Sequence, residues 1–203
     1  MQSPIKVFDK WAMLGKDRGM ETSHADSVSE ILDYALNRVK VNINDFTFLD
    51  FGCGNGWVAD KISKNSNCAL SVGVDGAENM IINAKSRQSE AVFYLDDLNA
   101  FKPKDKFDLI FSMEVIYYLE NPSLVIQNIR KMLNPNGRFI MGIDHYFENT
   151  ECYDWQEKVG TPMHLFKEEI WFDFFIKSNF KDVFSWRANS NDWAGTLTIT
   201  GTK

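Results

Sequence analysis

The segment Leu49–Trp57, with the sequence LDFGCGNGW, constrains the fold of this chain more than any other stretch. It contains Gly52, Gly54 and Gly56. These glycines come shortly after an apolar run that ends in the acid Asp50. In an open parallel α/β sheet the ligand site lies beyond the carboxyl ends of the strands, where glycine lets a ligand approach the backbone closely. The segment therefore predicts a ligand-binding turn at the end of a first strand.

The following residues support an alternating α/β organisation. Short runs rich in β-branched and aromatic residues predict strands at residues 46–49, 70–74, 91–95, 107–111 and 138–143. Helical patterns lie between most of these runs, and such alternation predicts right-handed crossovers and a parallel sheet. One of the helices begins at Asn121-Pro122, a capping residue followed by proline in the first turn. Residues 96–106 are expected to hold at most a short helix.

Two further regions flank this alternation. Before it, apolar residues from Val28 to Val39 follow a helical period, and Ser23 and Asp26 are the expected cap of that helix. After it, the aromatic and polar composition of residues 144–163 predicts an ordered loop over one end of the sheet. Later patterns predict a helix at 166–175 and a final pair of strands at 182–186 and 197–200.

We expect these regions to form one domain. Residues 1–45 would be an N-terminal helical cap over the ligand, and residues 46–143 the ligand-binding core. Residues 144–203 would supply a substrate loop and the C-terminal helix and strands.

Composition argues against several classes of partner, although it leaves a local basic patch open. The chain has 28 acidic and 22 basic residues and a net charge of −6, so it lacks the basic field that gathers phosphate backbones or anionic lipids. Cys53, Cys68 and Cys152 are scattered without C-x-x-C spacing, which favours a reducing compartment over a disulfide framework or a zinc site. No apolar run of membrane length is present. We expect a cytoplasmic protein without nucleic-acid, membrane or metal partners.

The residues around the glycines distinguish two kinds of ligand. A dinucleotide fingerprint has the spacing G-x-G-x-x-G, but Trp57 stands where its third glycine would be. Asp50 would repel a pyrophosphate and would favour a positively charged ligand. Asp75 ends the second predicted strand, where an acid can bind both hydroxyls of a ribose, although Asp at such a turn also often caps a helix. The predicted ligand therefore has a ribose and a cationic portion.

These motifs resemble those of class I S-adenosylmethionine-dependent methyltransferases. The similar segments occur in the family's order, at Leu49–Gly56, Val72–Ile81, Leu95–Leu98, Phe107–Pro122 and Leu133–Ile140. The resemblance implies a Rossmann-like three-layer sandwich with a mostly parallel seven-stranded sheet whose last strand is antiparallel. It also implies S-adenosylmethionine as the cofactor and S-adenosylhomocysteine as the product.

The resemblance assigns the cofactor to twelve positions: Asp50, Gly52, Cys53, Gly54, Asp75, Gly76, Ala77, Asp96, Asp97, Leu98, Ser112 and Met113. Asp50 would hold the ammonium group of the methionine portion, and Asp75 the ribose. Only one of Asp96 and Asp97 should reach the adenine amino group, and we favour Asp96. Cys53 is better interpreted as a small packing residue of the turn than as a nucleophile.

Residues of the acceptor side are expected on loops near the same end of the sheet. His145 and Tyr146 follow the fifth strand and are candidate catalytic residues; His145 could act as a general base, although a histidine in such a loop is as often structural. Candidate acceptor-binding residues are Trp11, Met20, Tyr117, His145, Tyr146 and Trp155. Trp11 and Met20 would line the acceptor pocket if the N-terminal segment covers the cofactor, but plain docking of that segment is an equal alternative.

The predicted activity is methyl transfer to a small-molecule acceptor by in-line displacement, in a monomer or homodimer. One alternative is a protein that keeps the cofactor fold without catalysis, since a fold does not by itself imply function. Another is an NAD(P)-dependent oxidoreductase, which Trp57 makes unfavourable.

Overall fold

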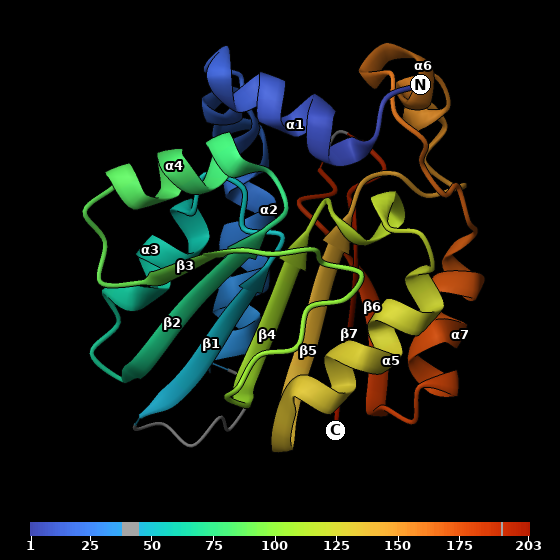
Figure 1. Cartoon of the computed structure of the whole chain (residues 1–203). Helices are drawn as coiled ribbons and strands as arrows, with labels where there is room; N and C mark the ends of the chain where they lie inside the picture. Colours follow the sequence, from blue (N-terminus) through green and yellow to red (C-terminus); the bar gives the residue numbers. More distant parts are fainter. Residues whose placement is uncertain (38–44, 192) are drawn as a thin grey trace.

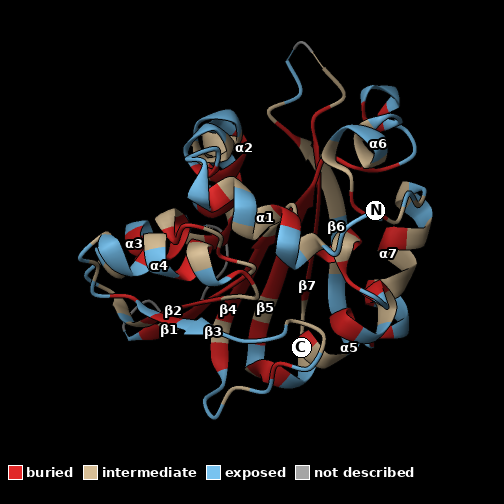
Figure 2. Cartoon of the chain, turned by 45° about the horizontal axis from the view of Figure 1, so that its top comes forward, coloured by how far each residue is buried: buried red, intermediate tan, exposed pale blue. Residues whose placement is uncertain are grey.

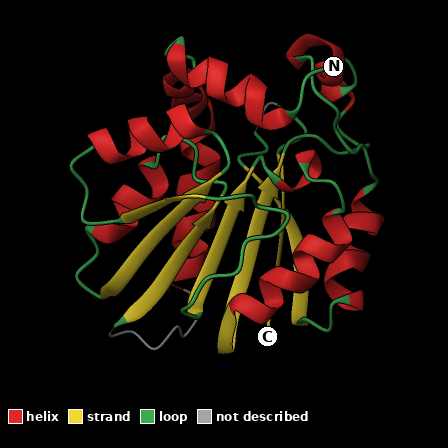
Figure 3. Ribbon diagram, in the orientation of Figure 1, coloured by secondary structure: helices red, strands yellow, loops and turns green. Residues whose placement is uncertain are grey.

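The computed structural model describes residues 1–37, 45–191 and 193–203 and shows one seven-stranded sheet between layers of helices (Figures 1 and 3). The strand order is β3-β2-β1-β4-β5-β7-β6, and β7 runs antiparallel to both of its neighbours whereas the other pairs are parallel. The strands are β1 Phe46–Phe51, β2 Cys68–Asp75, β3 Val92–Leu95, β4 Phe107–Met113, β5 Leu133–Ile143, β6 Lys181–Ala188 and β7 Thr196–Thr202. The predicted fold class and all seven predicted strands are confirmed.

Side chains that alternate along the strands bury both faces of the sheet. Phe48 belongs to an apolar cluster with α2 and α3, whereas the next residue, Leu49, packs in a larger cluster with α5 and α7. Successive residues of a strand point to opposite faces, so one short apolar run can serve two helical layers. The helices are α1 Pro4–Met13, α2 Asp17–Asn37, α3 Trp57–Ser63, α4 Glu78–Ser86, α5 Pro122–Met132, α6 Trp155–Val159 and α7 Glu168–Lys177.

The predicted cap of one helix is confirmed, and the predicted cap of another helix is wrong. Asn121 caps α5 as predicted, because its side-chain oxygen accepts a hydrogen bond from Leu124 N at 3.0 Å. Ser23 and Asp26 do not cap α2, which begins at Asp17; the Ser23 hydroxyl instead donates to Met20 O at 3.1 Å within the helix. Val39, the end of the predicted pattern, lies outside the described residues.

Two loop regions also differ from or refine the expectations. Residues 96–106 contain turns but no helix. Residues 144–163 are ordered as predicted, and they include α6 and the 3₁₀ helix Thr150–Cys152. Among the helices of the described residues, none combines the length and apolar character that crossing a bilayer requires.

The N-terminal residues form a cap across the carboxyl ends of the strands, which we define as α1 and the N-terminal half of α2 (Figure 1). Asp9 docks α1 on α4, since its two carboxylate oxygens accept hydrogen bonds from Asn79 N at 2.7 Å and Asn79 Nδ2 at 2.9 Å. The first turn of α4 thus finds an anionic partner for its free N–H groups. This docking encloses the end of the sheet at which the glycine turn lies.

Candidate active site

The glycine turn after β1 has a backbone that other residues could not easily adopt. Gly52, Gly54 and Gly56 have φ values of +84°, +51° and +78°, in the left-handed region that favours glycine. A side chain at Gly52 would overlap that of Val115, whereas the space beside Gly54 is open, with no atom nearer than Met80 Sδ at 3.9 Å. The turn therefore exposes bare backbone to a cavity.

Two connected cavities lie against this turn. The larger has a volume of about 250 Å³ and extends past Asp75, Gly76 and Ala77 to Asp97 and Leu98. The smaller has a volume of about 60 Å³ and is lined by Asp50, His24 and Asn55 among others. Both cavities share the lining residues Met20, Gly52, Gly54, Met80, Met113 and Glu114. Together they make one elongated site that follows the ends of β1, β2 and β4.

Asp50 lines the smaller of the two cavities. It is 2% exposed, and its Oδ2 has no hydrogen-bond partner among the described residues. Burial, with a smaller contribution from the charge of Asp75, raises the pKa of Asp50 to about 8. A backbone hydrogen bond from Ala59 lowers this pKa only in part, and a buried carboxylate oxygen without a partner is unfavourable, so the site suits a ligand that brings a positively charged donor to Oδ2.

Asp75 supports the glycine turn and also lines the larger cavity. Its Oδ2 accepts a hydrogen bond from Gly54 N at 3.0 Å, and its Oδ1 accepts one from Ala77 N at 2.9 Å. Burial raises the pKa of Asp75, while these backbone hydrogen bonds act in the opposite direction. Each carboxylate oxygen can accept a further hydrogen bond, so both the turn-supporting role and ribose binding are compatible with its geometry.

The other predicted cofactor residues are placed in three ways. Leu98, Met113 and Asp97 line the larger cavity, but Asp96 is exposed and is not among its lining residues; the Asp96 Oδ1 accepts a hydrogen bond from Asp97 N at 2.8 Å. Ser112 is buried and donates to Phe51 O at 2.8 Å.

Cys53 touches the smaller cavity and packs among apolar residues of α3, α4 and β3. Burial, followed by the charges of Asp50 and Asp75, raises the pKa of its thiol well above the usual value. Because the thiolate is the nucleophilic form, this environment favours the packing interpretation.

His145 and Tyr146, the predicted catalytic residues, are not among the described residues that line either cavity. His145 is 2% exposed, between the rings of Tyr117 and Trp155, and burial lowers its pKa to about 4. The Tyr146 hydroxyl donates to Gly195 O at 2.7 Å. Both side chains therefore pack the loop after β5 against the rest of the molecule.

Only some of the candidate acceptor-binding residues line a cavity. Met20 lines both cavities, whereas Trp11, Tyr117 and Trp155 line neither. The larger cavity is also lined by Tyr118, which the sequence places with Tyr117 in the loop after the fourth predicted strand, and by the cap residues Ile5 and Phe8, which the sequence did not indicate. Phe8 and Tyr118 pack edge to face with a centroid distance of 4.9 Å, so the pairing depends on how α1 docks and has no local sequence signal.

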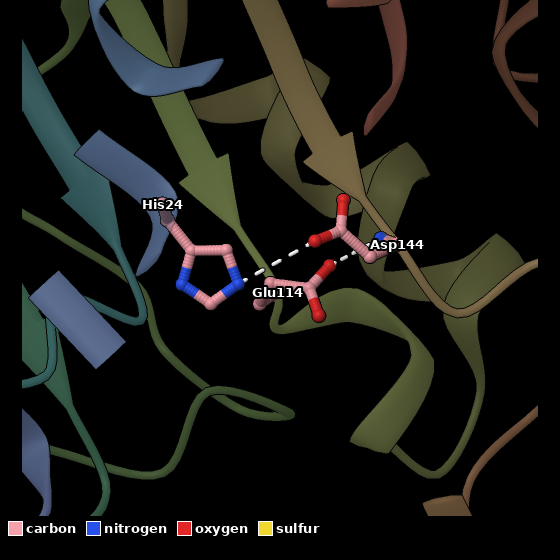
Figure 4. A group of neighbouring side chains, drawn as sticks. All are labelled: His24, Glu114 and Asp144. Atoms are coloured by element: carbon pink, nitrogen blue, oxygen red, sulfur yellow. Dashed lines mark hydrogen bonds and ion pairs between the residues drawn. The ribbon is translucent and has the colours of Figure 1, made fainter. Parts of the chain in front are cut away.

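Sequence analysis also did not predict the cluster of His24, Glu114 and Asp144 (Figure 4). His24 comes from α2, and the two acids follow β4 and β5. His24 Nε2 lies 3.5 Å from Asp144 Oδ2, and the backbone N–H of Asp144 donates to Glu114 Oε1. The positions of the acids after adjacent parallel strands could have indicated their proximity, but the position of His24 follows only from docking of the cap.

In this cluster, the pKa values of His24 and Glu114 each depend on the charges of the neighbouring groups. Burial by itself lowers the pKa of His24, but its interactions with Asp144 and Glu114 outweigh burial and raise it to about 9. Burial and the charge of Asp144 raise the pKa of Glu114 to about 8, against the opposing effect of His24. Glu114 also has a φ of +58°, which is uncommon for a residue other than glycine.

Comparisons of sequence identify the family. Residues 43–175 match the family described as methyltransferase domain. The chain is 30% identical over 139 residues to a malonyl-[acyl-carrier protein] O-methyltransferase of Ilyobacter polytropus, covering 62% of this chain and 52% of that protein. It is 23% identical over 141 residues to a ubiquinone biosynthesis O-methyltransferase of Bradyrhizobium diazoefficiens, covering 64% of this chain and 55% of that protein. The chain thus spans about half the length of these curated relatives.

Solved structures share the fold. The protein solved in complex with the Haloferax volcanii Trm112 methyltransferase activator has a TM-score of 0.83 and 24% identity, over 100% of this chain and 98% of that one. The N-methyltransferase NodS of Bradyrhizobium japonicum, solved with S-adenosylhomocysteine, has a TM-score of 0.66 and 21% identity, over 86% and 84% of the two chains. By its family match and its sheet order, the chain belongs to the class I S-adenosylmethionine-dependent methyltransferase family, with S-adenosylmethionine as its cofactor.

Proposed function

We propose that this chain transfers the methyl group of S-adenosylmethionine to a small-molecule acceptor by in-line displacement. The observation that carries the proposal is the buried carboxylate of Asp50, whose Oδ2 has no hydrogen-bond partner among the described residues, beside the bare backbone of Gly52 and Gly54. A buried anion is stable only with a compensating charge, and the ammonium group of the cofactor would provide it. When bound, the cofactor supplies an electrophilic methyl group on a positively charged sulfur.

The residues of the chain would bind and position the reactants. Asp75 would accept hydrogen bonds from the ribose hydroxyls, and Leu98 would pack at the adenine end. We propose Asp97 for the adenine amino group in place of Asp96, because only Asp97 of these two lines the cavity. Positioning of this kind can lower a barrier by about 7–11 kcal/mol, so methyl transfer requires little covalent help from the protein.

The enclosure of the site supports a small acceptor. Ile5 and Phe8 of the cap line the larger cavity, and the Ile5 side chain would be 3.1 Å from a Cβ atom placed on Gly76. Both curated relatives described above are named O-methyltransferases, and we propose an oxygen atom as the acceptor.

Calorimetric titration with S-adenosylhomocysteine, S-adenosylmethionine and NAD tests cofactor binding. We expect the two sulfur nucleosides to bind and NAD not to bind. Asp50→Asn, Asp75→Asn and Asp97→Asn should each weaken binding by roughly ten- to a hundredfold, since a hydrogen bond to a charged group contributes about 1.5–3 kcal/mol. Asp96→Asn is the matched control and should bind normally. Absence of binding by S-adenosylhomocysteine would refute the proposal.

A methyl-transfer screen across hydroxyl, carboxyl, amine and thiol acceptors tests catalysis separately. Transfer to an oxygen acceptor is expected. Cofactor binding without transfer to any acceptor would instead support the non-catalytic alternative.

We also propose that the free edge of the sheet binds a protein activator of the Trm112 kind. β3 is an edge strand, and its residues Val92, Tyr94 and Leu95 are 40%, 51% and 50% exposed (Figure 2). An unpaired edge with exposed apolar side chains is suited to the addition of a strand from another chain. The support from comparison is the similarity, over the full length of this chain, to a protein solved with such an activator.

Size-exclusion chromatography of the chain mixed with a Trm112 activator tests this second proposal. We expect a one-to-one complex that Tyr94→Glu disrupts. Ile176→Glu, which changes a similarly exposed residue of α7 (49% exposed), is the control. No complex with the wild-type chain, or equal effects of the two variants, would argue against binding at β3.

A further inference from the structure

The cluster of His24, Glu114 and Asp144 brings three potential metal ligands together. One ligand atom from each residue lies within 4.8 Å of the other two, and Figure 4 shows the three side chains pointing toward one another. The 3.5 Å separation of His24 Nε2 and Asp144 Oδ2 is close to the spacing of roughly 3.4 Å that two ligands about 2.1 Å from one ion take at a tetrahedral angle. Small side-chain movements would therefore place all three around one ion.

The orientation of the His24 ring fits this arrangement. His24 Nδ1 lies 2.8 Å from Met20 O, and because a carbonyl only accepts, Nδ1 carries the proton in that hydrogen bond. The Nε2 atom is then directed at the two carboxylates. Metal-binding histidines commonly donate their other ring N–H to a backbone carbonyl in this way, which sets the tautomer.

Hydrogen bonds also orient the carboxylates of Glu114 and Asp144, but their negative charges lack a full set of partners. The Tyr117 hydroxyl donates to Glu114 Oε2 at 2.7 Å. Asp144 is 6% exposed, and its Oδ1 has no hydrogen-bond partner within the described part of the chain. In that same part, no lysine or arginine forms an ion pair with either acid. One buried and one half-buried carboxylate therefore face one imidazole, and a metal ion that displaces the Nε2 proton of His24 would complete this ligand set.

We propose that His24, Glu114 and Asp144 bind a divalent transition-metal ion of the Mn²⁺ or Zn²⁺ type. Imidazole nitrogen favours such ions over Ca²⁺ and Mg²⁺, which prefer ligand sets made of oxygen alone. His24 and Glu114 line the smaller cavity and Glu114 also lines the larger one, so the remaining coordination positions face the space beside the glycine turn. They would take an oxygen ligand, either water or an acceptor hydroxyl.

Only the role of the ion rests on the proposed methyl transfer, because the binding of the ion does not require the cofactor. Mn²⁺ titration of the chelator-treated protein, followed by EPR and calorimetry without cofactor, tests the site directly. We expect one ion per chain, with Zn²⁺ competing and Mg²⁺ binding far more weakly. His24→Gln, Glu114→Gln and Asp144→Asn should each weaken Mn²⁺ binding by at least about tenfold.

Asp26→Asn is the matched control, since Asp26 is an exposed carboxylate two residues after His24 on α2 that lines neither cavity and is not in the cluster. It should leave Mn²⁺ affinity unchanged. Pulsed EPR of the wild-type protein should show coupling of Mn²⁺ to a histidine nitrogen, which tests the site even if a variant does not fold.

Failure of both Mn²⁺ and Zn²⁺ to bind would overturn the proposal and leave the cluster as an ion pair that fastens the cap. Equal Mn²⁺ affinity in the folded variants, or no nitrogen coupling, would overturn it as well. Titration of the same samples with S-adenosylhomocysteine separates this outcome from a failure of the proposed function.

Discussion

At the scale of single residues, ligand binding should change the protonation state of Asp50. The apo protein favours the protonated carboxyl because the group is buried beside Asp75, whereas a bound ammonium group favours the ionised form. Binding and proton release are therefore coupled at this position.

This coupling predicts a pH dependence of cofactor affinity. Since the pKa of Asp50 is raised to about 8, binding of S-adenosylhomocysteine below that pH requires loss of a proton. Affinity should increase between about pH 6 and pH 8, by up to about tenfold per unit, and then level off. Calorimetry across this range measures the slope. Asp50→Asn should reduce the slope and Asp96→Asn should retain it, and any slope that remains in Asp50→Asn would come from Glu114, whose pKa is also raised to about 8 and which lines the same cavities. A slope in Asp50→Asn equal to that of wild type would contradict the assignment.

The raised pKa of Asp50 also predicts how the stability of the ligand-free protein depends on pH. A raised pKa means that the folded state holds the proton of Asp50 in a pH range where the unfolded state has lost it, from the ordinary value of 3.8 up to about 8. Stability should therefore fall as pH rises through this range. In thermal melts at pH 8 we expect Asp50→Asn to be more stable than wild type, and the difference to disappear near pH 4.

The glycine turn gives a second prediction at the residue scale. Gly52→Ala would place a methyl group against Val115 and would keep a φ of +84°, so we expect a loss of about 1–3 kcal/mol in the free energy of unfolding. Urea denaturation measures it. Adding Val115→Ala should recover only the steric part. Gly19→Ala, in a helix with no atom within 4 Å of the new Cβ, should be neutral or stabilising.

At the scale of elements, the cap joins three parts of the chain. Asp9 holds α1 on α4, and the ion pair of Arg87 with Glu21 connects α2 to the segment after α4. These contacts are polar and partly exposed, and the apolar cluster of α1 with α4 is small, consisting of Ala12 and Phe8 against Ala77 and Met80, whereas the clusters of the sheet are larger. Elements held in this way open more easily than the core.

We therefore expect Asp9→Ala to loosen the cap without unfolding the protein. The loss of two hydrogen bonds corresponds to about 1–3 kcal/mol of local stability. Hydrogen exchange should accelerate in residues 4–13, and the affinity for S-adenosylhomocysteine should fall several-fold. Lys10→Ala, an exposed change on the same helix, is the control. Unchanged exchange in α1 would show that other contacts hold the cap.

A substitution of Tyr146 tests whether this residue has a structural or a catalytic role. It joins the loop after β5 to the residues before β7 through its bond to Gly195 O, so Tyr146→Phe should cost about 1–3 kcal/mol of unfolding free energy. Its rate of methyl transfer at a permissive temperature should equal that of wild type. A large loss of kcat with unchanged stability would restore the catalytic interpretation.

At the scale of the whole molecule, one apolar cluster extends through most of the chain. It includes Leu49 of β1, Ile126 of α5, Trp171 of α7 and Ile199 of β7. Because these elements share a core, we expect a single cooperative unfolding transition, with calorimetric and van't Hoff enthalpies that agree. Two separate transitions in scanning calorimetry would show that residues 144–203 form an independent unit.

Much of this architecture could be predicted from the sequence because its determinants are local. Alternating apolar residues specified the strands, Asn121-Pro122 specified the start of α5, and three glycines specified the turn after β1. Each of these patterns depends on a backbone geometry that spans only a few residues. The start of α2 was mispredicted for the same reason, since Ser23 has the composition of a cap but bonds inside a longer helix.

The sequence by itself determined the sheet, the glycine turn, the family and the acids at the strand ends. Only the tertiary structure decided which of Asp96 and Asp97 faces the cavity, that His145 is buried away from it, and that His24 meets Asp144. A turn breaks the two-residue alternation of a strand, so neighbouring positions there cannot be oriented from periodicity. The meeting of His24 with Asp144 depends on the docking of the cap over the sheet, and docking is determined by packing between distant segments rather than by any pattern within one of them.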